Sequence, residues 1–119
     1  MAKAIAFLGI IVLIIVGCGP DTIFVRPELD TPALHVSNGN RFLEQDKWED
    51  ARREFERAKY LDPYCTEAYI GLAIGYGRNG NPEKGFKLLE DARRLAAGDD
   101  ELRQIQIANE KLRQMSGSP

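Results

Sequence analysis

From about Pro32 onward, the chain repeats its own pattern of small and bulky apolar residues at an offset of about 34 residues. Small residues match small ones, and bulky apolar residues match bulky apolar ones. The matched pairs are Gly39 with Ala73, Phe42 with Tyr76, Ala51 with Gly85, Phe55 with Leu89, Ala58 with Ala92, and Leu61 with Leu95. A repeat of this period is one supersecondary unit that buries its apolar face by stacking on its neighbour. The sequence therefore predicts a short stacked-repeat fold.

The first unit is expected to contain two helices. The first helix spans about residues 33–44, after Thr31 as a side-chain cap and Pro32 at the first helical position. Asp46, followed by Glu49 three residues later, predicts a capping box at the start of the second helix. That helix is expected to end near Leu61, because a proline follows shortly after it.

The second unit and a last helix follow the same logic. One helix is expected at residues 66–78, then a turn, then a helix from Pro82 to about Ala97 that is closed by Gly98. Acidic residues open the last segment, residues 99–115, and suit a helix start. Its apolar residues recur every three or four positions, at Leu102, Ile105, Ala108, Leu112 and Met115. We expect it to cap the exposed flank of the second unit, with residues 116–119 as a frayed tail.

The spacing of these small and bulky residues resembles the tetratricopeptide repeat. The residues that carry the resemblance are Gly39, Phe42, Trp48, Ala51, Phe55, Ala58, Leu61 and Pro63, then Leu72, Ala73, Tyr76, Gly80, Gly85, Leu89, Ala92 and Leu95. The resemblance implies an all-α fold with two helix-turn-helix repeats in residues 32–98, and with the capping helix behind them. The second unit departs from the pattern at Gly85, where alanine is usual, and at Ala97, where proline is usual.

Several glycines of the second unit stand inside the expected helix at 66–78. Gly71 and Gly75 are four residues apart and Gly77 follows, and each costs a helix about 1 kcal/mol relative to alanine. Two interpretations are open. The glycines could allow close approach by a neighbouring helix or an extended peptide, or the second unit could simply be loosely built.

The N-terminal segment has the layout of a secretory signal peptide. Lys3 precedes an apolar run from Ala4 to Val16, and the small residue Gly17 and then Cys18 follow. At about 1.5 Å per helical residue, this run is too short to cross a hydrocarbon core of about 30 Å comfortably. An uncleaved signal anchor with an incidental cysteine is the alternative.

The tetrad Ile15-Val16-Gly17-Cys18 resembles the lipobox of bacterial lipoproteins. The resemblance implies cleavage before Cys18 and acylation of that cysteine. Residues 1–17 would then be the signal peptide, and residues 18–31 a lipidated tether. The expected location is the periplasmic face of a membrane. The outer membrane is favoured in an organism that has one, because Gly19 rather than an aspartate follows the cysteine.

Composition indicates no catalytic, metal or nucleic-acid site. The chain has 16 basic and 18 acidic residues, a near balance that gives no reason to expect nucleic acid as a partner. His35 is the only histidine, and Ser37, two residues later, would point to another face of the helix. We expect no cofactor, no metal and no enzymatic activity, although an enzymatic role for Cys65 is a rival hypothesis.

In tetratricopeptide arrays the first helix of each unit lines a groove that binds a partner. The resemblance implies that the groove residues here are Val36, Asn40, Leu43, Glu44, Glu67, Ile70, Ile74, Gly77 and Arg78. Their chemistry is apolar in the middle and charged at the edges, which argues against a clamp for a peptide carboxylate. An extended apolar segment is the expected occupant. It could be the chain's own residues 23–25 or a segment of a partner.

The function that follows is a membrane-anchored adaptor or scaffold in the bacterial cell envelope. It would hold another envelope protein or peptide segment at the membrane, in support of an envelope complex such as a secretion or pilus system. The alternative is a self-associating structural envelope lipoprotein, since two repeats are fewer than the three usually needed for stability. A homo-oligomer is therefore a further possibility for its partner.

Overall fold

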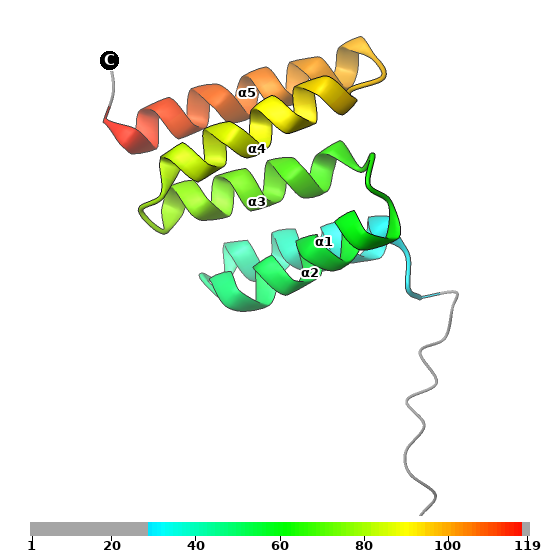
Figure 1. Ribbon diagram of the computed structural model, residues 1–119. Helices are drawn as coiled ribbons and strands as arrows, with labels where there is room; N and C mark the ends of the chain where they lie inside the picture. Colours follow the sequence, from blue (N-terminus) through cyan, green and yellow to red (C-terminus); the bar gives the residue numbers. More distant parts are fainter. Residues whose placement is uncertain (1–28, 118–119) are drawn as a thin grey trace, which may run out of the picture.

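The computed structural model describes residues 29–117, so the expected signal peptide, Cys18 and most of the tether lie outside the described residues. The described part is all-α (Figure 1). It consists of five helices, which are α1 Pro32–Glu44, α2 Trp48–Leu61, α3 Thr66–Arg78, α4 Pro82–Leu95 and α5 Asp99–Ser116.

The helices pair as antiparallel hairpins that stack on each other. α1 packs on α2, α3 packs on α4, and α5 covers both α3 and α4 (Figure 1). α1 also contacts α3, and α3 contacts α5, so the odd-numbered helices lie side by side and run in the same direction. This layer of three helices forms one face of the molecule.

Two helix starts follow directly from local sequence. The Thr31 hydroxyl accepts a hydrogen bond from the Leu34 N–H at 3.2 Å, and the Asn81 side chain accepts one from the Lys84 N–H at 3.2 Å. Pro32 and Pro82 stand at the first helical positions, where no backbone donor is needed. The predicted cap at Thr31 and the predicted helix starts at Pro32 and Pro82 are confirmed, whereas the cap at Asn81 was not predicted.

Three local predictions are corrected. The capping box does not form, because Asp46 adopts a left-handed φ of 56° and α2 begins after Lys47 without a side-chain cap. α4 ends at Leu95, and Gly98 instead precedes α5 in an extended conformation. Ser116 belongs to α5 rather than to a tail, because the left-handed residue that ends this helix is Gly117.

The core repeats along the stack. Ala51, Phe55 and Ala58 on α2 are fully buried, and the residues that the sequence pairs with them on α4, Gly85, Leu89 and Ala92, are buried too. Leu89 and Ala92 of α4 form a hydrophobic cluster with Ile105, Ala108 and Leu112 of α5. The aromatic ring of Phe55 fills the space between the two hairpins, where it packs with Leu43 and Leu72.

The helical glycines of α3 have a packing role. A Cβ atom built on Gly71 would lie 2.3 Å from the Phe55 ring, and one on Gly75 would lie 1.9 Å from the Trp48 ring. A Cβ on Gly77 would lie 2.3 Å from Leu112 of α5. The interpretation as close approach is therefore right, and large side chains of neighbouring helices are what approaches.

Candidate functional site

A groove runs across the layer formed by α1, α3 and α5. It encloses about 630 Å³. Its walls are Val36, Asn40, Leu43 and Glu44 of α1, Glu67, Ile70, Gly71, Ile74 and Arg78 of α3, and Gln104 and Lys111 of α5. The half-buried side chains of Val36, Ile70 and Ile74 supply its apolar floor, and its charged residues are exposed.

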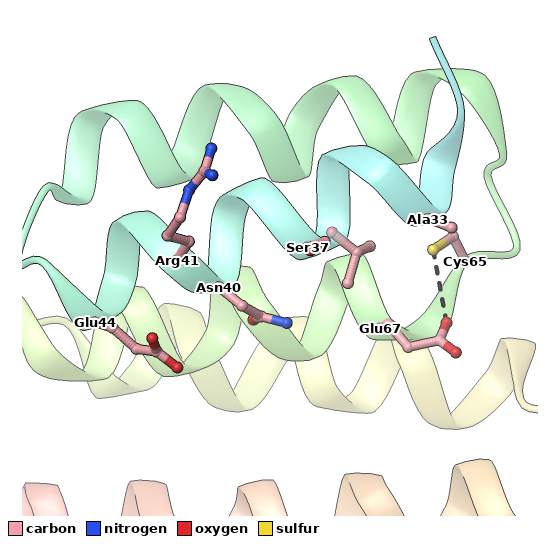
Figure 2. A pocket seen from close by; sticks show the side chains of 8 residues that line it. Ala33, Ser37, Asn40, Arg41, Glu44, Cys65 and Glu67 are labelled. Carbon is pink, nitrogen blue, oxygen red and sulfur yellow. Dashed lines mark hydrogen bonds between the residues drawn. The ribbon is translucent and has the colours of Figure 1, made fainter. Parts of the chain in front are cut away.

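A second hollow of about 680 Å³ adjoins the groove on the outer side of α1 (Figure 2). It shares Val36, Asn40, Glu44 and Glu67 with the groove, and adds Ala33, Ser37, Arg41 and Cys65. Figure 2 shows that residues of α1 line it along most of that helix, whereas only the start of α3 contributes. The two hollows together form one continuous surface along α1, open to solvent.

The structure brings together every predicted groove residue except Gly77. Gly77 lies instead where α3 meets α5, against Leu112 and Met115. Gly71, Gln104 and Lys111 also line the groove and were not among the predicted residues. For Gln104 and Lys111, no short motif shows which side of α5 turns toward α3. The spacing of the apolar residues on α5 was the one sequence pattern that bears on how this helix is oriented toward α3.

The groove carries two basic and two acidic side chains, which are Arg78, Lys111, Glu44 and Glu67. Arg78 donates from Nη1 to the Leu43 carbonyl oxygen at 3.1 Å, which joins the ends of α1 and α3. Lys111 lines the same groove from α5. Within residues 29–117, no ion pair includes Glu44, Glu67, Arg78 or Lys111. Both signs of charge are thus free to meet complementary charges on a bound segment.

Cys65 lies at the start of α3, at the edge of the second hollow. Its side chain is 9% exposed, and its thiol donates toward Oε2 of Glu67 at 3.6 Å. Burial and the nearby carboxylate raise the pKa of Cys65. A nucleophilic cysteine needs a lowered pKa and access to solvent, so this environment disfavours the rival hypothesis of a reactive thiol.

A polar cluster lies on the other side of α1, facing α2. His35 Nδ1 is 2.6 Å from Oε2 of Glu54, and its Nε2 is 2.8 Å from Oδ1 of Asp30. Arg57 of α2 also binds Asp30 through two hydrogen bonds. The cluster fastens Asp30, two residues before the start of α1, to α2. Ser37 is not part of it and lies on the groove side instead.

The carboxylates around His35 shift its proton equilibrium. Desolvation lowers the pKa of His35, but hydrogen bonds to Glu54 and Asp30 outweigh it, so the pKa is raised above 6.5. The hydrogen bonds from Arg57 and His35 lower the pKa of Asp30 from 3.8 to about 2. Asp30 is therefore ionised at neutral pH, and His35 is protonated over a wider range than a free histidine.

This cluster predicts a pH dependence of stability. The contribution of His35 is complete below pH 6.5 and is lost as the pH rises through the raised pKa, whereas that of Asp30 is lost only as the pH falls from 3.8 toward about 2. Denaturant titrations should show the free energy of unfolding falling as the pH rises from 6.5 through the raised pKa of His35. His35→Gln should remove most of this slope. An equal slope in both proteins would contradict the assignment.

Two structural absences apply to the described part of the chain. Residues 29–117 contain no group of three or more histidine, cysteine or acidic side chains placed to hold a metal ion. None of the five helices in this region has the length and apolar character needed to cross a membrane.

No protein-family model, no curated protein and no solved structure matches the chain.

Proposed function

We propose that this chain is a membrane-anchored adaptor of the bacterial cell envelope, built from two tetratricopeptide repeats and a capping helix. The groove across α1, α3 and α5 is the observation that carries the proposal. Residues that the family resemblance implies for partner binding, on two helices distant in sequence, line one hollow. Its apolar floor and unpaired rim charges suit an extended peptide segment rather than a small molecule.

The repeat architecture is supported by equivalent packing in the two hairpins. Phe55 and Leu89 occupy matched positions in the sequence and are both buried at the centre of their clusters. Gly39 lets Phe55 approach α1 closely, because its would-be Cβ lies 2.6 Å from the ring. Gly85, where the family usually has alanine, has the Ala73 carbonyl oxygen 2.7 Å from its own would-be Cβ. The departure from the family pattern thus accommodates a tight contact.

The expected occupant is a segment with an apolar centre and charged flanks. An acidic flank would meet Arg78 and Lys111, and a basic flank would meet Glu67 or Glu44. We propose that the occupant comes from another envelope protein. Residues 23–25 of the chain itself lie outside the described residues. The binding of Asp30 to Arg57 directs the chain toward α2, the side of α1 away from the groove.

The anchor is tested by Cys18→Ser in the full chain. Mass spectrometry of the mature protein should show acyl chains on Cys18 in the wild type, and the protein should sediment with membranes. The variant should carry no lipid and leave the membrane fraction, because two or more acyl chains are needed for stable anchoring. A wild-type chain without lipid would refute the anchor.

The second candidate function is self-association as a structural envelope lipoprotein. The exposed side chains of Leu102, Ile107 and Met115 on α5, at 43%, 46% and 41%, favour it. Light scattering on the purified acylated protein in detergent, corrected for bound detergent, separates the two roles. A monomer supports the adaptor, and a stable oligomer supports the structural role.

A further inference from the structure

One end of the molecule exposes large amphipathic side chains. Tyr60, at the end of α2, is 76% exposed, and Tyr64, in the connection to α3, is 70% exposed. Leu29, the first described residue, is 57% exposed. We call these three residues the tyrosine end. Tyrosine combines an apolar ring with a polar hydroxyl, and it is enriched at interfaces between an apolar environment and water.

The tyrosine end is also where the N-terminal segment joins the helices. Asp30 is fixed to Arg57, and the Arg57 guanidinium lies 5.3 Å from the centre of the Tyr60 ring. Figure 1 shows the chain entering α1 near the connection between α2 and α3. Asp30 is therefore linked through Arg57 to the ring of Tyr60.

The opposite end differs in chemistry. Its turns consist of residues 45–47, which are Gln, Asp and Lys, and residues 79–81, which are Asn, Gly and Asn. All six residues are exposed. Aromatic side chains at the tips of the turns are thus confined to the end where the N-terminal segment arrives.

The length of the preceding segment limits how far this end can move from an anchor at Cys18. Residues 19–28 span at most roughly 35 Å when fully extended, and about 17 Å on average as a flexible chain. The tyrosine end would therefore stay within roughly 35 Å of the bilayer surface, and about 17 Å from it on average. This step rests on the proposed lipid anchor.

We propose that the tyrosine end rests on the headgroup layer of the membrane, with Tyr60 and Tyr64 inserted among the lipids. Tyrosine rings lie at this level in membrane proteins, where their amphipathic character matches the interface. Charge attraction does not drive the contact, because exposed Asp99 and Asp100 open α5 at the same end of the bundle. Asp30 is paired with Arg57 and His35, so this end does not present that carboxylate unpaired to anionic lipids.

The contact has a consequence for the groove. All five helices extend between the tyrosine end and the opposite end (Figure 1), and the groove crosses α1, α3 and α5 on one side of this bundle. With the tyrosine end on the bilayer, the groove opens sideways above the membrane. A partner segment would lie alongside the bilayer rather than between the protein and the lipid.

The test uses the full acylated chain in vesicles of phosphatidylethanolamine and phosphatidylglycerol with brominated acyl chains, which quench tryptophan at the interface. Tyr64→Trp places a probe at the tyrosine end, and Gln114→Trp places a matched probe on exposed α5 near the other end. The wild type supplies the background from Trp48. We expect the quenching of the added tryptophan at position 64 to exceed that at position 114 by at least about twofold. Equal quenching would overturn the proposal.

A second variant separates insertion from mere nearness. Tyr60→Ser in the Tyr64→Trp protein leaves the anchor and its length unchanged. Quenching should fall by about half if the two rings insert together, whereas unchanged quenching means that the segment alone holds this end near the lipid, and the proposal fails. Circular dichroism checks that each variant is folded.

The same preparation distinguishes failure of the anchor from failure of the contact. If mass spectrometry finds no acyl chains, the proposed anchor is refuted, and the purified chain is then added to an excess of the same vesicles. Stronger quenching at position 64 than at position 114 would still support the lipid contact. No difference between the two positions would overturn it.

Discussion

Phe55→Ala is expected to destabilise the protein by about 3–5 kcal/mol. The Phe55 side chain is fully buried and packs between the two hairpins with Leu43 and Leu72. Truncation removes the largest buried ring of the first hairpin and leaves a cavity that helices on both sides border. Since small domains are stable by only about 5–15 kcal/mol, the loss would remove a large share of the free energy of unfolding.

Urea titration followed by circular dichroism measures this effect. Tyr60→Ala is the matched control, because it removes an aromatic ring from the same helix at a position that is 76% exposed. The control should change the free energy of unfolding by less than about 0.5 kcal/mol. Similar losses in both variants would mean that the ring of Phe55 is not the centre of this core.

Gly71→Ala should also destabilise the protein, although alanine is the better helix former by about 1 kcal/mol. The new methyl group would overlap the Phe55 ring, whose nearest atoms lie 2.3 Å from the would-be Cβ. The ring cannot retreat, because Gly39 of α1 approaches it at 2.6 Å by the same measure. Overpacking of this kind costs about 1–3 kcal/mol, and we expect a net loss in that range.

Gly98→Ala is the control for Gly71→Ala, because a Cβ at Gly98 would meet nothing within 4 Å. A double-mutant cycle then assigns the cause. Phe55→Leu replaces the aromatic ring with a smaller side chain. Gly71→Ala should therefore lower the free energy of unfolding clearly less in that background than in the wild type. Equal costs in the two backgrounds would show that the methyl group and the ring do not collide.

Local signals in the sequence predicted the helices well. Prolines and side-chain caps fixed the starts of α1 and α4, and the predicted bounds of α3 agree with Thr66–Arg78. The capping box failed because Asp46 takes a left-handed conformation in the turn, which prevents it from capping α2. A motif defined by residue types alone does not include the backbone angle that the turn requires.

Features that depend on distant residues were out of reach. His35 binds Glu54, and Asp30 binds Arg57, across gaps of 19 and 27 residues. No local sequence pattern predicts such pairs. Most of the groove was predicted through the resemblance to the tetratricopeptide repeat, in which the first helix of each unit lines the groove. Its α5 wall, Gln104 and Lys111, was not, because the rotation of α5 about its axis is set by how Ile105 and Leu112 pack.

The central claim is that the groove holds a segment of another envelope protein, and photo-crosslinking in living cells tests it most directly. A photoreactive amino acid is placed at Asn40, which is exposed and lines the groove, and at Gln106, an exposed α5 position that does not line it. Lys111→Glu in the Asn40 background reverses one rim charge.

The account predicts an adduct from position 40 with a different protein, absent from position 106 and weakened by Lys111→Glu. Mass spectrometry of the adduct identifies the crosslinked segment, which should have an apolar centre and charged flanks. An adduct only with the chain itself or a second copy, or no adduct that depends on the groove, would contradict the account.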